Sequence, residues 1–402
     1  MRVTKKRAYV AALVGAGLVV SACGSSSSGG NAATNPTTGS STPAAGPINI
    51  SATSLTQDFS AMAQLKSLAA KGSGSVGVIL PDTDTSSRYT EFDTPLLTKA
   101  FETAGLTASQ ISIKNAQHSD TTFVTDAQAM ITNGAKVLLI DPEDPGTGKQ
   151  VANLAKAHGV AVIDYDRITQ GSYYISFDNV AVGNLIGTGF QKCASDWGVS
   201  SPNLIEMAGD PTDNNATLFK QGYDKVIAAN PSWKVAAKPA GTWTPNKALT
   251  EFQGAYTANP SVNSAIIPND ENAGPIINYL RNKGIKKNTF PITGQDATLQ
   301  GIQNILSGYQ CGTAYKPVFL EAQAAAAVAM FVRAGETPPA ALVNGQTSNP
   351  NDGGKNMPSV LLTAEWVTTS NLEDTVVKDN FVPAKQICTA KYTAECQAAG
   401  IS

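Results

Sequence analysis

Acidic, amide, basic and aromatic residues recur directly after short aliphatic runs of this sequence. An ionised Asp offers two acceptor oxygens, Asn offers donors and an acceptor, and Arg offers a fork of donors. Such a set can bind the adjacent hydroxyl groups of a neutral polyol, and Tyr89 and Trp243 can cover the apolar face of its ring. Each residue alone has a plainer explanation, since an Asp after a strand is often a helix N-cap and a Trp is often core. The prediction of a polyol site therefore depends on the whole set, which comprises Asp82, Arg88, Tyr89, 141–144, 164–167, 209–215, Trp243, 269–272, 294–296 and 315–316.

Several other chemistries lack the residues they need. The chain holds two His, His118 and His158, which excludes a His-rich metal site and argues against a His-based catalytic triad. Gly146–Gln150 resembles a phosphate-binding loop, but Gln150 stands where Ser or Thr would hold Mg²⁺. A formal net charge of −2 argues against a nucleic-acid partner. We predict no metal, no cofactor and no enzyme; a secreted glycosidase stays as an alternative, because many Asp residues are present but nothing selects a catalytic pair.

From residue 74 the chain alternates aliphatic runs with helical patterns, and it does so twice. Continuous aliphatic strands separated by helices indicate buried parallel sheets with crossover helices, so we predict an α/β fold of two similar halves. Ligands of such sheets bind at the carboxyl ends of the strands, where the polar residues stand. The first half has expected strands at 76–80, 111–113, 137–140 and 160–163 and helices at 92–104, 123–132 and 148–158. The second has expected helices at 181–197, 216–229, 246–258, 273–283 and 299–306 and strands at 204–207, 233–237, 265–267 and 291–293, followed by a helix at 318–334, a loop at 336–358 and strands at 359–363 and 365–368.

The N-terminus has the pattern of a secretion signal followed by a lipid attachment site. Basic residues at 2–7 precede an apolar run at 8–20, which is too short for a bilayer core of ~20 residues but fits a signal peptide. Residues 20–23 are similar to the lipobox of bacterial lipoproteins, whose Cys is acylated and becomes the first mature residue; an ordinary signal peptide is the alternative. Residues 24–47 carry no charge and predict a flexible tether. We expect an extracytoplasmic protein anchored to the cell membrane by lipid on Cys23, with a mature net charge of −6.

The other four Cys residues predict disulfide bonds. An exported protein meets an oxidising compartment, and four Cys allow three connectivities. We favour Cys388–Cys396, which closes a short terminal loop, together with Cys193–Cys311. Free thiols are the alternative.

A series of short segments runs in order through both halves: 163–167, 174–179, 182–183, 213–219, 269–270, 294–297 and 315–317. Together they resemble the periplasmic sugar-binding proteins of ABC importers, of the type I periplasmic binding protein fold, and are most similar there to the D-xylose-binding branch. The resemblance covers roughly residues 74–330. It implies two Rossmann-like lobes with parallel sheets that close on a sugar, joined by a three-segment hinge near 178–179, 316–317 and 359–365.

The resemblance also implies which residues contact the sugar. They are Arg88, Asp166 and Arg167 from the first lobe, and Asn215 or its neighbour Asn214, Trp243, Asn269, Asp296 and Lys316 from the second. Tyr89 stands where the xylose-binding branch tends to have Trp, and residues 81–85 depart from the family's first loop. Both departures can shift the sugar preference, so we expect xylose or a similar aldose.

The expected organisation is a signal peptide (1–22), an acylated Cys with tether and lead-in helix (23–73), an N-terminal lobe (74–178 plus 317–363) and a C-terminal lobe (179–316 plus 364–402). We predict a monomer that captures a monosaccharide between its lobes by hinge closure and delivers it to an ABC permease in the membrane. The alternative from another class is a sensing receptor of the same fold that signals to a membrane kinase. The tail after residue 336 has no assigned function, and we expect it to return a strand to the second lobe.

Overall fold

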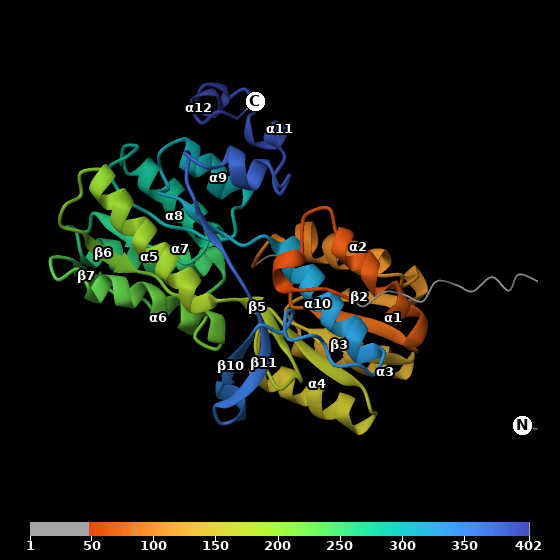
Figure 1. Ribbon diagram of the computed structural model, residues 1–402. Coiled ribbons are helices and arrows are strands. Elements are labelled where there is room, and N and C mark those ends of the chain that lie inside the picture. The colour runs from red at the N-terminus through yellow and green to blue at the C-terminus, as the bar shows by residue number, and fades with distance from the viewer. Residues whose placement is uncertain (1–47, 84, 402) are drawn as a thin grey trace, which may run out of the picture. The chain divides into compact units, whose positions relative to one another are not determined.

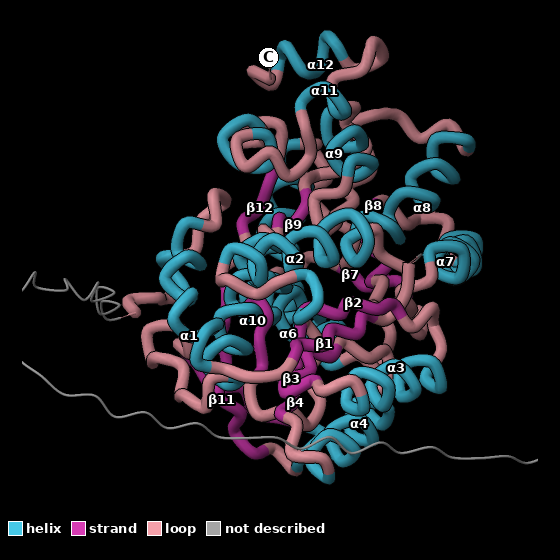
Figure 2. The backbone as a smooth tube through the Cα atoms, turned by 90° about the vertical axis from the view of Figure 1, so that its right-hand side faces the viewer, coloured by secondary structure: helices cyan, strands magenta, loops and turns pink. Residues whose placement is uncertain are grey.

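The computed structural model describes residues 48–83 and 85–401 (Figures 1 and 2). The predicted signal peptide, Cys23 and the tether lie outside the described residues. The chain enters through two short helical turns, Ala52–Ser54 and Ser60–Leu65, and α1 (Lys66–Lys71). These pack on the first half of the fold, where the Ala52 N–H donates to the Ala341 carbonyl at 3.0 Å.

A sheet covered by helices on both faces forms the first half. Its strands are β1 (Ser75–Leu80), β2 (Ile111–Asn115), β3 (Ala135–Ile140), β4 (Ala161–Tyr165), β5 (Tyr174–Phe177), β10 (Gly345–Asn349) and β11 (Lys355–Leu362), and its helices are α2 (Thr94–Thr103), α3 (Asp120–Thr132), α4 (Pro145–Ala157) and α10 (Val318–Arg333). The seven strands lie in the order β10-β11-β5-β4-β3-β1-β2, parallel except for the β10–β11 pair. Side chains alternate between the faces of a strand, so Val78 packs with α2 and α10 while Ile79 packs with α3 and α4. Burial on both faces explains why these strands are aliphatic throughout.

The second half repeats this arrangement around a smaller sheet. Parallel strands β6 (Asn203–Glu206), β7 (Lys234–Ala237) and β8 (Ser264–Ile266) lie between α5 (Asn179–Asp196) and α6 (Asn214–Ala228) on one face and α7 (Pro245–Ala258) and α8 (Asp270–Asn282) on the other. Helices α5 and α6 approach closely because Gly183 has no side chain; a Cβ there would lie 2.0 Å from the Phe219 carbonyl oxygen. The remaining elements are α9 (Leu299–Leu306), β9 (Thr313–Tyr315), β12 (Glu365–Val367), α11 (Ala384–Ile387) and α12 (Thr393–Ala398).

Among the described residues, the chain passes between the two halves from β5 to α5, from β9 to α10 and from β11 to β12. Helix-covered, mainly parallel sheets confirm the predicted α/β fold, whereas the lobe boundaries given above stay predictions. The loop expected at 336–358 is wrong in part, because β10 lies within it. Its polar sequence gave no strand signal, since an antiparallel edge strand buries few of its side chains. The strand expected at 291–293 makes a single bridge, between Ile292 and Ala265.

Two disulfide bonds are present in the structure. Cys193 of α5 is joined to Cys311, with the two Cα atoms 5.6 Å apart, and Cys388 is joined to Cys396, with the Cα atoms 5.8 Å apart. These are the two pairs that the sequence analysis favoured.

Candidate functional site

The carboxyl ends of strands from both sheets converge on one cavity. The loop after β1 and the end of β4 supply its first side, and the segments after β6, β7, β8 and β9 supply the other. Apart from Asn214, every residue predicted to contact a sugar lines this cavity. The lining residues are Thr85, Ser86, Arg88, Tyr89, Asp166, Arg167, Asp213, Asn215, Phe219, Trp243, Asn269, Gln295, Asp296 and Lys316.

Arg88 is held by buried carboxylates of its own half. Its Nε and Nη2 donate to Asp93 at 2.9 and 3.0 Å, and Nη2 also donates to Glu321 Oε2 of α10 at 2.8 Å. Burial raises the pKa of Glu321 to about 8, against the opposing effect of Arg88. The third nitrogen, Nη1, lies 3.4 Å from Asp166 Oδ1 and has no hydrogen-bond partner among the described residues. This arrangement fixes the guanidinium plane and leaves one donor for a ligand.

Arg167 connects the two halves beside Trp243. Its Nη1 donates to Asp141 at 3.1 Å within the first half, and its Nε donates to Asp213 Oδ2 of the second half at 3.2 Å. The Trp243 Nε1–H donates to the same Asp213 oxygen at 2.9 Å. Tyr89 lies near Arg167, with its ring centre 6.0 Å from the guanidinium carbon. One carboxylate of the second half thus orients both a cation and an aromatic ring at the cavity.

Two acidic residues of the cavity have left-handed backbone conformations. Asp166 has φ of 59° and Asp296 has φ of 87°, which L-residues adopt at a cost and which cluster at functional sites. Burial alone would raise the pKa of Asp166, but Arg88, Lys316 and Arg167 hold it below its ordinary value. Lys316 Nζ lies 3.1 Å from Asp296 Oδ1. The carboxylate of Asp166 is therefore an ionised acceptor at the cavity, and the carboxylate of Asp296 is held there by Lys316.

Asn215 lies inward at the start of α6, where its Oδ1 accepts hydrogen bonds from Tyr174 and Asn179, and its neighbour Asn214 lies outside the cavity. Asp213 is the N-cap of α6, and its carboxylate accepts the Asn215 N–H at 2.8 Å. Asn215 then lies inward: its Nδ2 donates to the Asp166 carbonyl at 2.9 Å, and its Oδ1 accepts from Asn179 Nδ2 at 2.9 Å. The neighbouring Asn214, one residue along the helix, is not among the lining residues.

The contact residues predicted from the sequence do not include every member of the cavity lining. Thr85, Ser86, Asp213, Phe219 and Gln295 also line it. Gln295 is 2% exposed, and none of the described groups donates to its Oε1. Its place after an aliphatic run was the available signal, because Gln295 stands beside Asp296 in the segment already selected.

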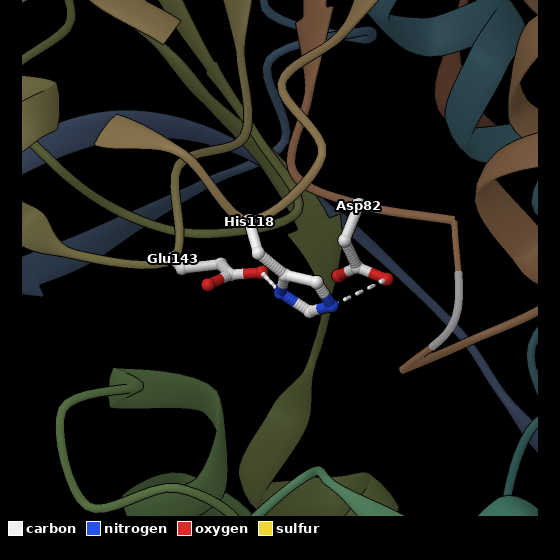
Figure 3. Close-up of side chains that lie close together, drawn as sticks. All are labelled: Asp82, His118 and Glu143. Atoms are coloured by element: carbon white, nitrogen blue, oxygen red, sulfur yellow. Dashed lines mark hydrogen bonds and ion pairs between the residues drawn. The ribbon is translucent and has the colours of Figure 1, made fainter. Parts of the chain in front are cut away.

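A further polar cluster, not predicted from the sequence, lies at the strand ends of the first sheet (Figure 3). His118 Nδ1 lies 2.5 Å from Glu143 Oε1, and its Nε2 lies 3.9 Å from Asp82 Oδ1. The two carboxylates thus face different nitrogens of one imidazole ring, so the ring bridges them. His118 and Glu143 line a second cavity, which shares Thr85, Arg167, Asp213 and Trp243 with the first.

Comparison with known proteins gives the family. Residues 76–337 match the family model described as a periplasmic binding protein domain. The chain is 34% identical over 297 residues to the D-xylose-binding periplasmic protein of Escherichia coli, covering 72% of this chain and 86% of that protein. It is 29% identical over 340 residues to the multiple sugar-binding periplasmic receptor ChvE of Rhizobium radiobacter, covering 78% and 92%.

Among solved structures, the fold is similar to a carbohydrate transporter solute-binding protein of Chloroflexus aurantiacus in complex with D-glucose. The TM-score is 0.67 at 26% identity, with 77% of this chain and 97% of that one covered. These relatives are binding proteins and receptors, which supports the prediction that the chain is not an enzyme. No helix in the described part of the chain is long and apolar enough to cross a membrane. The chain belongs to the periplasmic binding protein family.

Proposed function

We propose that the protein captures a monosaccharide, xylose or a similar aldose, in the cavity between its two halves. The observation that carries the proposal is that the charged groups of the cavity are paired, while two of its buried polar atoms lack hydrogen bonds. Arg88, Arg167 and Lys316 each lie against carboxylates, so the cavity needs no charged ligand. Arg88 Nη1 and Gln295 Oε1 are buried and have no hydrogen-bond partner among the described residues. Hydroxyl groups can serve both, because a hydroxyl donates one hydrogen bond and accepts others.

Aromatic side chains support a ring-shaped ligand. Trp243 and Phe219 both line the cavity and meet edge to face, with ring centres 6.4 Å apart. Their apolar faces suit the C–H groups of a sugar ring, whereas the carboxylates of Asp166 and Asp296 suit its hydroxyls. The names of the relatives, a D-xylose-binding protein and a protein in complex with D-glucose, agree with this class of ligand.

Capture would proceed by closure of the two halves around the sugar, with no covalent step. Lining residues come from both sheets, so a bound sugar contacts both halves and stabilises the closed form. We further propose that the closed form delivers its sugar to an ABC permease, that the protein acts as a monomer, and that lipid on Cys23 anchors it. Mass spectrometry of the mature N-terminus tests the anchor, and an unmodified Cys23 or cleavage elsewhere would contradict it.

A thermal-shift screen against pentoses and hexoses tests the capture. A sugar present at 100 times its Kd should add ~2.7 kcal/mol of stability. X-ray scattering of the same sample should show a smaller radius of gyration with that sugar than without it. No stabilisation by any sugar would count against the proposed function, and turnover of a labelled sugar would favour the glycosidase instead.

Asp296→Ala and Trp243→Ala should each abolish the sugar-induced shift while the protein still unfolds cooperatively. Asp296→Ala removes a fixed acceptor, and Trp243→Ala removes a ring that lines the cavity. Calorimetric titration of both variants gives the measurement. Full affinity in both would mean that the sugar binds elsewhere.

A further inference from the structure

The C-terminal segment 368–401, here called the tail, lies beyond the family match and has a core of its own. Its buried side chains form one hydrophobic cluster with α9 and β9 of the second half. The tail residues in this cluster are Leu372, Val376, Phe381, Val382, Ile387, Tyr392, Cys396 and Ile401. A segment with this many buried side chains is part of the fold, so its contacts near the cavity can affect ligand binding.

The tail is fixed to the second half. Leu306 of α9 and Tyr315 of β9 belong to its cluster, and the Tyr315 hydroxyl donates to Asp379 Oδ2 at 3.0 Å. Figure 1 shows α11 and α12 beside and beyond α9. The tail should therefore move together with α9 and β9.

From that position the tail reaches the first half through one aromatic contact. Phe381 stacks on Phe92 with ring centres 4.0 Å apart and planes 6° from parallel. In the described structure, Phe92, Leu96 and Val318 of α10 are the first-half side chains in or against the tail cluster, and Phe92 forms the stack with Phe381. The stack thus joins the two halves at a point outside the sugar cavity.

Phe92 belongs to the helical turn that presents the cavity's first side. This turn, Tyr89–Asp93, directly follows Arg88. Tyr89 lines the cavity, and Asp93 holds Arg88 in a bidentate ion pair and accepts a hydrogen bond from the Tyr165 hydroxyl. A ring held against Phe92 therefore acts on the same short segment that fixes Arg88.

We propose that Phe381 is a positioning residue for sugar capture: in the closed form its stack on Phe92 holds the turn Tyr89–Asp93 and, through Asp93, the guanidinium of Arg88. The inference rests on the proposed function and adds to it a role for the tail. Opening of the halves separates α9 from the turn and breaks the stack, so the stack favours the closed, sugar-holding form.

The test compares Phe381→Leu, Phe92→Leu and the double variant, which keep an apolar side chain but lose the stacked pair. Each should raise the Kd for the sugar about threefold to tenfold, mostly through faster dissociation, as expected for a contact made only on closure. The double variant should cost no more than either single variant, since all three remove the same contact. Titration calorimetry and stopped-flow dissociation give these values.

Ile387→Ala is the matched control. Ile387 is buried in α11, which packs on α9, so its truncation loosens the tail core without removing the stack. It should lower the unfolding temperature and leave the Kd within about twofold of wild type. An equal loss of affinity in this variant would overturn the proposal, because tail integrity rather than the stack would then matter.

Hydrogen exchange at the amides of residues 89–93 separates this proposal from the proposed function. Faster exchange there in Phe381→Leu than in wild type, measured with the sugar bound, supports positioning. Unchanged exchange together with unchanged Kd would overturn it. If wild type itself binds no sugar, the proposed function fails; if wild type binds the sugar and Phe381→Leu matches it in both exchange and Kd, this proposal alone fails.

Discussion

Gln295 and Arg88 differ from the other polar residues of the cavity in their hydrogen bonding. Most of these residues are already paired with one another, whereas Gln295 Oε1 and Arg88 Nη1 are buried polar atoms with no hydrogen-bond partner among the described groups. An unpaired buried acceptor costs ~1–3 kcal/mol. The free protein therefore bears a cost at Gln295 that a sugar hydroxyl would relieve.

Gln295→Met, which keeps the length of the side chain without its amide, should move stability and affinity in opposite directions. The free energy of unfolding without sugar should stay the same or rise by up to ~1 kcal/mol, and the Kd should rise about tenfold. Chemical denaturation and calorimetry give the two values. Gln323→Met is the control: Gln323 is buried in α10, does not line the cavity and donates to Thr56 and Phe319, so this variant should lose stability but keep its affinity. A Gln295→Met protein with wild-type affinity would contradict the prediction.

At this scale the sequence identified most of the cavity but not which neighbour lies inward. Residues 294–296 were predicted as part of the polyol site, but only Asp296 was named as a sugar contact, because successive side chains of an extended chain point to opposite sides. The left-handed backbone at Asp296 turns the chain and brings both Gln295 and Asp296 to the cavity. The choice between Asn214 and Asn215 likewise depended on where α6 begins, which an N-cap motif locates only within a residue or two.

At the scale of elements, the first turn of α8 contacts the loop after β1. Glu271 Oε1 accepts the Ser87 N–H at 3.3 Å, which gives the two halves a further contact. Desolvation, with the nearby Asp296 and Asp270 carboxylates, raises the pKa of Glu271 to about 8 from an ordinary value of 4.5. The folded protein thus holds a proton at Glu271 that the unfolded chain releases at lower pH.

This carboxyl group should make stability fall with rising pH. Below about pH 4.5 both the folded and the unfolded protein hold the proton of Glu271. Between about pH 4.5 and about pH 8 the unfolded chain releases this proton while the folded protein keeps it, so the free energy of unfolding falls across that window. Denaturant unfolding of wild type and Glu271→Gln between about pH 5 and about pH 9 measures the difference. The Gln variant keeps an acceptor for Ser87 and should have the flatter profile. Equal slopes in the two proteins would show that Glu271 titrates normally.

Sequence patterns located the aliphatic strands and their helices because burial on both faces requires a continuous run of apolar residues, whichever strands pair with it. The polar strand β10 gave no such signal, and the strand predicted at 291–293 makes only one bridge, since the pairing of both segments is decided by neighbours distant in the sequence.

At the scale of the whole molecule, the two disulfides constrain chain segments of very different length. Cys193 and Cys311 are 118 residues apart, whereas Cys388 and Cys396 are 8 apart. Loop-closure entropy predicts a stabilisation of ~4.7 kcal/mol for a loop near the first size and ~2.5 kcal/mol for the second.

Cys193→Ser with Cys311→Ser should therefore destabilise the protein more than Cys388→Ser with Cys396→Ser, by about 2 kcal/mol. Denaturant unfolding of both double variants under oxidising conditions measures this. A larger loss from the tail pair would mean that the short bridge holds the tail fold itself rather than only restricting the unfolded chain.

The pairing of buried charges around the cavity has a consequence for ionic strength. Arg88 with Asp93, Arg167 with Asp141 and Lys316 with Asp296 are enclosed pairs, and dissolved ions screen such pairs far less than they screen exposed ones. A neutral sugar brings no counterions to release. Its affinity should therefore change by less than about twofold between about 0.01 M and about 1 M sodium chloride, whereas a charged ligand would lose affinity over the same range. We therefore expect this cavity to bind a sugar about equally well at low and at high ionic strength.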